Sequence, residues 1–300
     1  MRYVIEHETA LAFPKPVREH QFELRLAPRE DGGVRRVACE VEVEPAAPLR
    51  IHFDCFGNLV HRVSLLAPHD ALRARVTAEV ETSLGNPFDF PPVPVAAERR
   101  WIDRALRDDP SLLDFVLHRS DAVPALDGAL AELAPPAFDP DRALLQNLLA
   151  LMAWAGATFR YVPGATEVHG ALAEFAEHRA GVCQDFAHLV VAVARSWGFP
   201  ARYVMGYADP GSVAPESPGP QATHAWADVL IPGAGWRGFD ATAGLVANDA
   251  YVPVAVGRDS RDTAPLRGTF KGDDGGAPPH VAVRVERVER ERQQVQVQVQ

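Results

Sequence analysis

The chain has 300 residues, of which 47% are hydrophobic and 23% charged. This composition is ordinary for a globular protein and excludes wholesale disorder, a coiled coil and a collagen-like rod, while the length favours two domains. The formal net charge is −10, from 30 basic and 40 acidic residues. We therefore expect no nucleic-acid partner, because phosphate contacts need lysine and arginine, and no attraction to anionic lipid surfaces.

Targeting signals and cysteine usage point to a cellular compartment. No apolar run of about 18 residues is present, and the N-terminal sequence lacks a basic segment followed by an apolar one. We therefore expect neither a membrane span nor a secretory signal. Three cysteines, an odd number, argue against a disulfide framework and favour a reducing compartment. Together these features predict a cytoplasmic protein.

Residues 1–95 carry the alternation of apolar and polar side chains that is typical of half-buried strands. The clearest runs are residues 20–26, 37–43 and 72–80. Turn signals such as Asp31-Gly32-Gly33 separate them. Short strands with polar outer faces predict an antiparallel β-sandwich domain at residues 1–95, with a structural or substrate-shaping role.

A proline-rich linker at residues 86–94 ends this pattern, because proline removes amide donors and fixes φ. The hydrophobic period then becomes helical. Helices are predicted at residues 97–106, 111–118 and 168–178, and a further one that contains Leu144 to Met152. Asp139 and Pro140 resemble the N-cap and first residue of that last helix.

Strands return after Pro200 and complete the second domain. They are predicted at residues 201–207, 224–230, 236–240, 252–256 and 281–288. Helices followed by strands predict an α+β domain at residues 96–300. The tail at residues 293–300, which alternates valine and glutamine, is expected to extend the last strand or to fray.

Cys183 precedes an apolar run at helical spacing, Phe186 to Ala194, which ends at Gly198. Gly181 permits a tight turn into this helix. We therefore place Cys183 in the first turn of a buried helix, where unpaired amides and the helix dipole favour the thiolate. The alternative is an inert buried cysteine, which is the commoner fate of a lone thiol.

The other cysteines, Cys39 and Cys55, each fall on the apolar face of a predicted strand. Cys55 shares its face with Ile51 and Phe53. We interpret both cysteines as core residues. A hairpin that turns at residues 45–48 would place them opposite each other, but we predict no disulfide.

A turn at residues 232–235 joins two predicted strands into a hairpin, with His224 at the start of the first and Asp240 at the end of the second. Asp240 is then expected beside His224, directly across or on the diagonal. A neighbouring carboxylate fixes the tautomer of an imidazole and stabilises the imidazolium. Alone, His224 could be an ordinary structural histidine. Its combination with Cys183 and Asp240 indicates a nucleophilic site.

Two long segments of the chain, GVCQDFAHLVVAVARSWGFPARYVMGY and THAWADVLIPGAGWRGFDATAG, resemble the transglutaminase-like superfamily in the order Cys, His, Asp and in their aromatic context. Three shorter motifs, VAVGRD, PLRG and Phe56-Gly57-Asn58, resemble its bacterial branch with an N-terminal β domain. The resemblance covers essentially the whole chain. It implies a papain-like α+β core in which the active-site helix packs on an antiparallel sheet.

The resemblance also implies a mechanism. Cys183 would attack a carboxamide or peptide carbonyl, His224 would carry the proton to the leaving amine, and Asp240 would orient His224. The backbone amide of Cys183 is expected to be one oxyanion donor. The candidates for the second donor are Gln184, Tyr161 and Trp226.

The resulting thioester would react with water or with an amine. We predict a cysteine-dependent hydrolase or acyltransferase that acts on a glutamine side chain, an amide or an isopeptide bond of a protein or peptide. The alternatives are a protein cross-linking transglutaminase and a non-enzymatic binding module that retains the fold. Cys183 and His188 lack the further nearby ligands of a zinc site, and no loop has calcium-ligand spacing, so we expect no metal and no cofactor. The sequence leaves the oligomeric state open.

Overall fold

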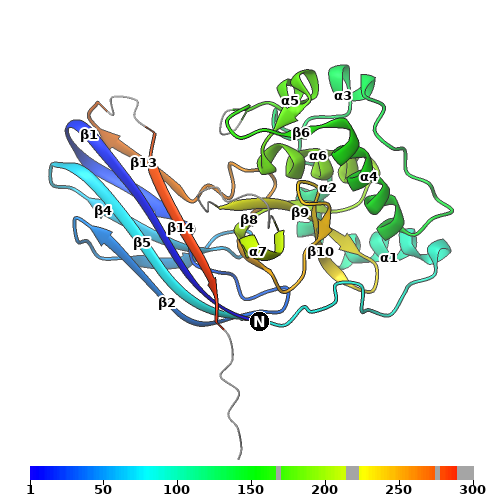
Figure 1. The fold of residues 1–300 in the computed structure, drawn as a ribbon, viewed down its shortest axis with the longest axis horizontal. Coiled ribbons are helices and arrows are strands. Elements are labelled where there is room, and N and C mark those ends of the chain that lie inside the picture. The colour runs from blue at the N-terminus through cyan, green and yellow to red at the C-terminus, as the bar shows by residue number, and fades with distance from the viewer. Residues whose placement is uncertain (167–169, 214–222, 274–277, 289–300) are drawn as a thin grey trace, which may run out of the picture.

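The computed structural model describes residues 1–166, 170–213, 223–273 and 278–288. Figure 1 shows a strand-rich part on one side and a part that combines helices and strands on the other. The paired strands of both larger sheets are antiparallel. The predicted α+β fold with an N-terminal β region is confirmed.

The strand-rich part is one sheet built around its first strand. Its strands are β1 (Arg2–Leu24), β2 (Val34–Glu44), β3 (Arg50–Phe53), β4 (Leu59–Leu65), β5 (His69–Thr82), β13 (Leu266–Lys271) and β14 (His280–Arg287). The first half of β1 pairs with β5 and β14, and β2 extends this half beyond β5. The second half of β1 pairs with β4 and β13, and β3 extends that half beyond β4. Side chains from both halves, such as Ile5 and Phe22, meet in one core.

The two C-terminal strands differ from the predicted division of the chain into residues 1–95 and 96–300. Both β13 and β14 pair with β1 and so belong to the N-terminal sheet. The physical reason is the length of β1, which spans 23 residues. After pairing with β4 and β5, each half of β1 still has an open edge whose backbone groups need partners. The C-terminal strands supply them.

The second part contains a five-stranded sheet in the order β11-β10-β9-β8-β12. Its strands are β8 (Ala201–Ala208), β9 (His224–Ile231), β10 (Gly235–Asp240), β11 (Leu245–Val246) and β12 (Tyr251–Gly257). A separate parallel pair joins β6 (Arg160–Tyr161) to β7 (Ala180–Gly181). All the strands predicted after Pro200 are present.

Helices cover this sheet, and the central one is α6. The helices are α1 (Val95–Asp108), α2 (Asp114–Leu117), α3 (Gly128–Glu132), α4 (Leu144–Thr158), α5 (Leu172–His178), α6 (Cys183–Ser196) and α7 (Pro210–Val213), with a 3-10 turn η1 at Pro110–Leu113. The buried helix α6 packs on β8, β9 and β10, and α4 packs on α6. The predicted helix at residues 111–118 is split between η1 and α2. Of the predicted helix at residues 168–178, α5 is the described part, while residues 168 and 169, like the tail at 293–300, lie outside the described residues.

The predicted start of the helix that corresponds to α4 is wrong. The helix begins at Leu144, whose backbone N–H donates to the Glu98 carboxylate at 2.8 Å. Asp139 instead accepts a hydrogen bond from the Asp141 amide within a local turn. Glu98 is buried on α1, so the free amide at the start of α4 is satisfied by a residue distant in sequence.

The predicted core position of Cys55 is also wrong. Cys55 is exposed in the turn that follows β3, and Ile51 and Phe53 on β3 are 62% and 68% exposed. The cause is that the strand ends at Phe53, before Cys55, and that β3 has only four residues and lies at the edge of its sheet. Cys39 is half-buried against the N-terminal core. Because β2 pairs with β5 and β3 pairs with β4, the hairpin expected to bring the two cysteines together does not form.

The two parts share a continuous apolar core. Tyr203, Met205 and Val252 of the second sheet are buried in the same cluster as Ile5 and Phe22 of the first. The N-terminal sheet therefore packs directly on β8 and β12, next to the strands that carry the predicted site. No helix in the described segments has the length and apolar content needed to cross a bilayer.

Candidate active site

Cys183 is the first residue of α6, as the sequence predicted, and Asp185 holds this helix start in place. The Asp185 carboxylate accepts hydrogen bonds from the Val182 amide at 2.8 Å and from the Thr166 hydroxyl at 2.6 Å. Burial raises the pKa of Asp185, against the opposing effect of these donors. A Cβ at Gly181 would overlap the Asp185 carboxylate, which explains the glycine there. No feature of the sequence marks Thr166 as a part of the site.

The predicted hairpin joins His224 to Asp240. The paired register of β9 and β10 ends with Phe239 opposite Ala227, and the same register extended by one residue sets Asp240 level with Trp226. His224 is then on the diagonal, one of the two positions expected. His224 Nε2 donates to Asp240 Oδ2 at 2.7 Å.

Asp240 is fully buried, and its carboxylate accepts hydrogen bonds from two side chains and two backbone amides. Besides His224, the Tyr251 hydroxyl donates to Oδ2 at 2.9 Å. The backbone amides of Thr242 and Ala243 donate to Oδ1 at 3.0 and 3.2 Å. Burial would raise the pKa of Asp240, but the hydrogen bonds from His224 and Tyr251 and the His224 charge hold it below its ordinary value. The carboxylate is therefore ionised. Tyr251 was not predicted, because nothing near it in sequence marks it as polar machinery.

His224 lies between this carboxylate and the thiol. Burial alone would lower its pKa, but the hydrogen bond to Asp240, the nearby Cys183 and the charges of both outweigh burial and raise the pKa of His224 to about 10. Because Nε2 faces Asp240, Nδ1 is the nitrogen left for Cys183. The structure thus brings the three predicted residues together, with the imidazole in the middle. The thiol is half-buried, and the His224 side chain is 17% exposed.

The three candidate oxyanion donors differ in their surroundings. Trp226 is buried and donates its single N–H to Asp228 Oδ1 at 3.1 Å, so that group is already committed. Tyr161 is half-exposed and pairs with Gly181, two residues before Cys183, and burial of its hydroxyl together with the nearby Cys183 and Asp240 raises its pKa. Gln184 directly follows Cys183, and its side-chain nitrogen is buried without a hydrogen-bond partner in the described part of the chain.

His188, one turn further along α6, is not arranged with Cys183 as a metal ligand. Its Nε2 accepts a hydrogen bond from the Ser260 amide at 3.1 Å, and its ring packs on Tyr203. Within the described ranges, no group of three or more His, Cys, Asp or Glu side chains has the arrangement to hold a metal ion.

The fold and the site together define a papain-like α+β protein with a cysteine at a helix start and a histidine and an aspartate on the adjoining sheet. Two family models match the chain. The transglutaminase-like superfamily matches residues 132–241, and the bacterial transglutaminase-like N-terminal region matches residues 3–81. The chain belongs to the transglutaminase-like superfamily.

Relatives extend over nearly the full length. An uncharacterized protein of Mycobacterium leprae is 30% identical over 290 residues, which cover 96% of this chain and 99% of the relative. An uncharacterized protein of Mycobacterium tuberculosis is 32% identical over 293 residues, covering 95% and 92%. A solved structure from Cytophaga hutchinsonii, of a protein proposed to be a cysteine protease, has a TM-score of 0.69 and 22% identity, covering 96% of this chain and 92% of that one. The last likeness supports the fold.

Proposed function

We propose that this protein is a cysteine-dependent hydrolase or acyltransferase that opens amide bonds through a thioester on Cys183. The observation that carries the proposal is the position of His224, which hydrogen-bonds the buried, ionised Asp240 and lies close enough to Cys183 for the thiol to contribute to its raised pKa. Membership of the transglutaminase-like superfamily supports an activity of the cysteine-protease type. A binding module would have no need of a charged pair of this kind beside a thiol.

In the first half of the proposed reaction, the Cys183 sulfur attacks the carbonyl carbon, and the C=O electron pair moves to the oxygen. The raised pKa of His224 favours an imidazolium beside the thiolate. As the tetrahedral intermediate collapses, the C–N bond breaks, and His224 gives its Nδ1 proton to the departing ammonia or amine. The acyl group then remains on sulfur as a thioester.

In the second half, neutral His224 takes a proton from water or from an incoming amine, which attacks the thioester carbonyl. Water yields a carboxylic acid, and an amine yields a new amide. The C–S bond breaks, and sulfur regains its proton or its ion pair with His224. Asp240 keeps its charge throughout and holds the imidazole with Nδ1 toward the sulfur.

The negative oxygen of the intermediate needs two donors. We assign one to the Cys183 backbone amide, because a first-turn N–H has no acceptor within its helix. We assign the other to Gln184, whose buried side-chain nitrogen lacks a partner among the described residues. Tyr161 stays the second candidate, since its hydroxyl lies near the site. Trp226 is unsuited, because Asp228 already takes its N–H.

The substrate class we propose is a protein or peptide that presents a glutamine side chain, another amide or an isopeptide bond. The partly exposed thiol and imidazole, with half-exposed Tyr161 nearby, are accessible to an extended chain. Three free cysteines, one of them exposed, suit a reducing compartment such as the cytoplasm.

The proposal is tested by iodoacetamide labelling between about pH 5 and 9, followed by peptide mass spectrometry. Cys183 should label rapidly well below the pKa of an ordinary thiol, about 8.5, while exposed Cys55 in the same molecule serves as the control. His224→Ala should remove this low-pH labelling. Equal pH profiles for Cys183 and Cys55 would instead favour the binding module. For an active protein, Cys183-dependent ammonia release with and without an added primary amine separates hydrolysis from transfer and cross-linking, and cleaved peptide products indicate a protease.

A further inference from the structure

Tyr251 reaches the site from an unexpected direction. Its hydroxyl contacts Asp240 at 2.9 Å, yet Tyr251 is on β12 and Asp240 is on β10, and both β9 and β8 lie between these strands. The phenol packs edge-on against Trp226, with ring centroids 5.3 Å apart. Gly206 on β8 leaves room for the Trp226 ring on which the phenol packs, because a Cβ there would overlap both that ring and the Val252 carbonyl.

The strand that carries Tyr251 lies at the edge of its sheet, and the N-terminal part of the chain holds it there. At the start of β12, the Thr82 hydroxyl donates to the Asp249 carbonyl at 2.7 Å. In the middle, the Arg29 amide donates to the Pro253 carbonyl at 2.8 Å. Thr82 and Arg29 belong to the region of the first sheet, so the position of β12 depends on that sheet.

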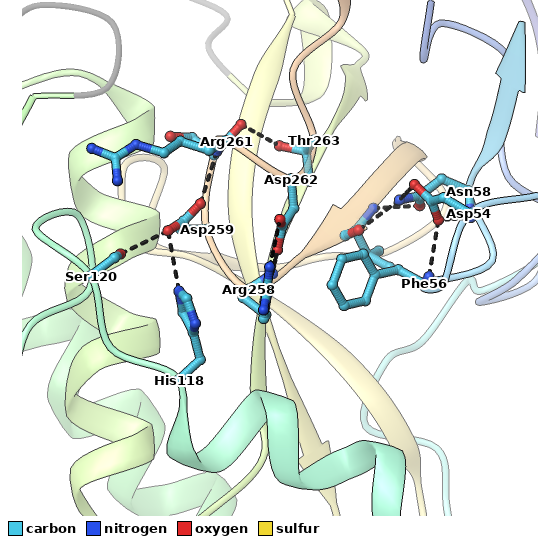
Figure 2. Close-up of polar contacts among 12 residues, drawn as sticks. Asp54, Phe56, Asn58, His118, Ser120, Arg258, Asp259, Arg261, Asp262 and Thr263 are labelled. Carbon is cyan, nitrogen blue, oxygen red and sulfur yellow. Dashed lines mark hydrogen bonds and ion pairs between the residues drawn. The ribbon is translucent and has the colours of Figure 1, made fainter. Parts of the chain in front are cut away.

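The third contact is made by Asn58, whose side chain bonds both backbone polar groups of Val256, as a neighbouring strand would. Its Oδ1 accepts from the Val256 amide and its Nδ2 donates to the Val256 carbonyl, both at 2.8 Å. Asn58 is fully buried, and Asp54 fixes it by accepting from its backbone amide at 2.9 Å and from Nδ2 at 3.0 Å. Figure 2 shows Asn58 and Asp54 beside the end of β12.

Beyond Asn58, the loop that follows β12 is fixed to the second domain. Arg258 forms an ion pair with Asp262 at 2.8 Å, and buried Asp259 accepts from the Ser120 hydroxyl at 2.7 Å (Figure 2). The strand therefore has little freedom at either end. Its orientation is set jointly by this loop and by the N-terminal sheet.

We propose that Tyr251 is a positioning residue for Asp240, and that the N-terminal sheet, by holding β12 through Thr82, Arg29 and Asn58, is a structural part of the active site. This inference rests on the proposed function of the Cys183, His224 and Asp240 cluster. It gives the N-terminal domain a defined role, because the domain fixes the strand that supplies the second side-chain donor to the Asp240 carboxylate.

The test compares Tyr251→Phe with Tyr207→Phe by the pH profile of Cys183 alkylation, which needs no substrate. Tyr207 is a matched control, because the hydrogen bonds of its buried hydroxyl are to the Leu26 carbonyl and to His7, both outside the cluster. Tyr251→Phe removes a donor that keeps the pKa of Asp240 low, so the carboxyl takes up a proton at higher pH. We expect the acidic limb to move to higher pH, and the labelling rate measured on that limb to fall by up to about tenfold, as expected for the loss of one hydrogen bond to a charged acceptor. Tyr207→Phe should leave both unchanged.

A double-mutant cycle tests the part played by the N-terminal sheet. Thr82→Val removes only the hydroxyl that holds Asp249. Ser83→Ala is its control, because Ser83 donates to the Gly33 carbonyl at 2.9 Å within the N-terminal region. We expect Thr82→Val to slow labelling by about two- to threefold in the wild-type background, a fraction of one hydrogen bond, and not at all in Tyr251→Phe. Ser83→Ala should have no effect in either background.

The possible outcomes are distinguishable. If wild-type Cys183 labels like Cys55, the proposed function itself fails. If wild-type Cys183 is reactive but Tyr251→Phe matches Tyr207→Phe, only the positioning role is overturned. If Thr82→Val slows labelling equally in both backgrounds, the N-terminal sheet does not act through Tyr251. Melting temperatures of all variants show whether each remains folded at the labelling temperature.

Discussion

Replacement of Asp240 by asparagine is the most informative single change, because it alters one atom in a fully specified hydrogen-bond arrangement. Four donors meet the two carboxylate oxygens: Tyr251 and His224 at Oδ2, and two backbone amides at Oδ1. The amides cannot reverse their role, so the new asparagine side chain should keep its oxygen at the Oδ1 position. Its NH₂ group then faces His224, where it can only donate.

That reversal changes the tautomer of His224. An NH₂ group opposite Nε2 requires Nε2 to accept, so the ring proton moves to Nδ1, which faces the thiol. Neutral His224 can then no longer take the proton of Cys183. The loss in kcat/KM should exceed about 10²-fold, the upper range for one charged hydrogen bond, and approach about 10⁴-fold if the wrong tautomer dominates.

The pH dependence gives a second readout of the same change. Asp240 contributes to the raised pKa of His224, about 10 in the intact protein. Without that charge, the imidazolium loses its proton at lower pH and no longer stabilises the thiolate, so the rising limb of the Cys183 alkylation profile should move to higher pH, toward that of Cys55. Glu98→Gln is the matched control, because Glu98 is also a buried carboxylate that accepts a hydrogen bond, from the Leu144 amide, but lies outside the cluster on α1. Wild-type rates and an unmoved limb in Asp240→Asn would refute the role assigned to the carboxylate.

Single contacts elsewhere in the molecule give three more tests. Gln184→Met should lower kcat by about 10²-fold if Gln184 is an oxyanion donor. Trp226→Phe should change kcat of the folded protein by less than about threefold, because the Trp226 N–H donates to Asp228. A larger loss in Trp226→Phe than in Gln184→Met would reverse the assignment. Burial lowers the pKa of His7 to about 4, so its neutral form stabilises the fold above about pH 6.5 and this contribution is lost as the pH falls toward 4. The free energy of unfolding in urea should therefore change between about pH 7 and pH 5 by about 2 kcal/mol less in His7→Gln than in wild type. An equal change in the two proteins would contradict this account. Gly181→Ala should lower the free energy of unfolding by about 1–3 kcal/mol, because its methyl group overlaps Asp185. Gly156→Ala, at an open helical position, is the control. Equal stabilities of the two variants would show that the turn before α6 adapts to the methyl group.

The parts of the site that could be predicted from sequence are those fixed by local patterns. The period of the apolar residues after Cys183, with glycine on both sides, is enough to define a buried helix and its first turn. The turn at residues 232–235 sets the register of a hairpin, so the proximity of His224 and Asp240 follows from counting residues. Both inferences depend on contacts within a few tens of residues.

The parts that could not be predicted depend on contacts between distant segments. Leu144 is capped by Glu98 from another helix, so the local signal at Asp139 was misleading. Tyr251 reaches Asp240 across two strands, and no periodicity in the sequence reports a contact of that kind. The exposure of Cys55 follows from the place of β3 at the sheet edge, which is a property of the whole topology.

The pairing of β1 with β14 has a consequence for how the molecule is made. Tyr3 lies opposite Arg287, so a residue made early on the ribosome finds its partner only after nearly all of the intervening chain has been synthesised. Until then the first domain is incomplete, and one edge of each half of β1 remains unpaired and can pair with other chains. We expect a fragment that stops before β13 to aggregate, and a circular permutant that links the ends of β14 and β1 to tolerate the new connection.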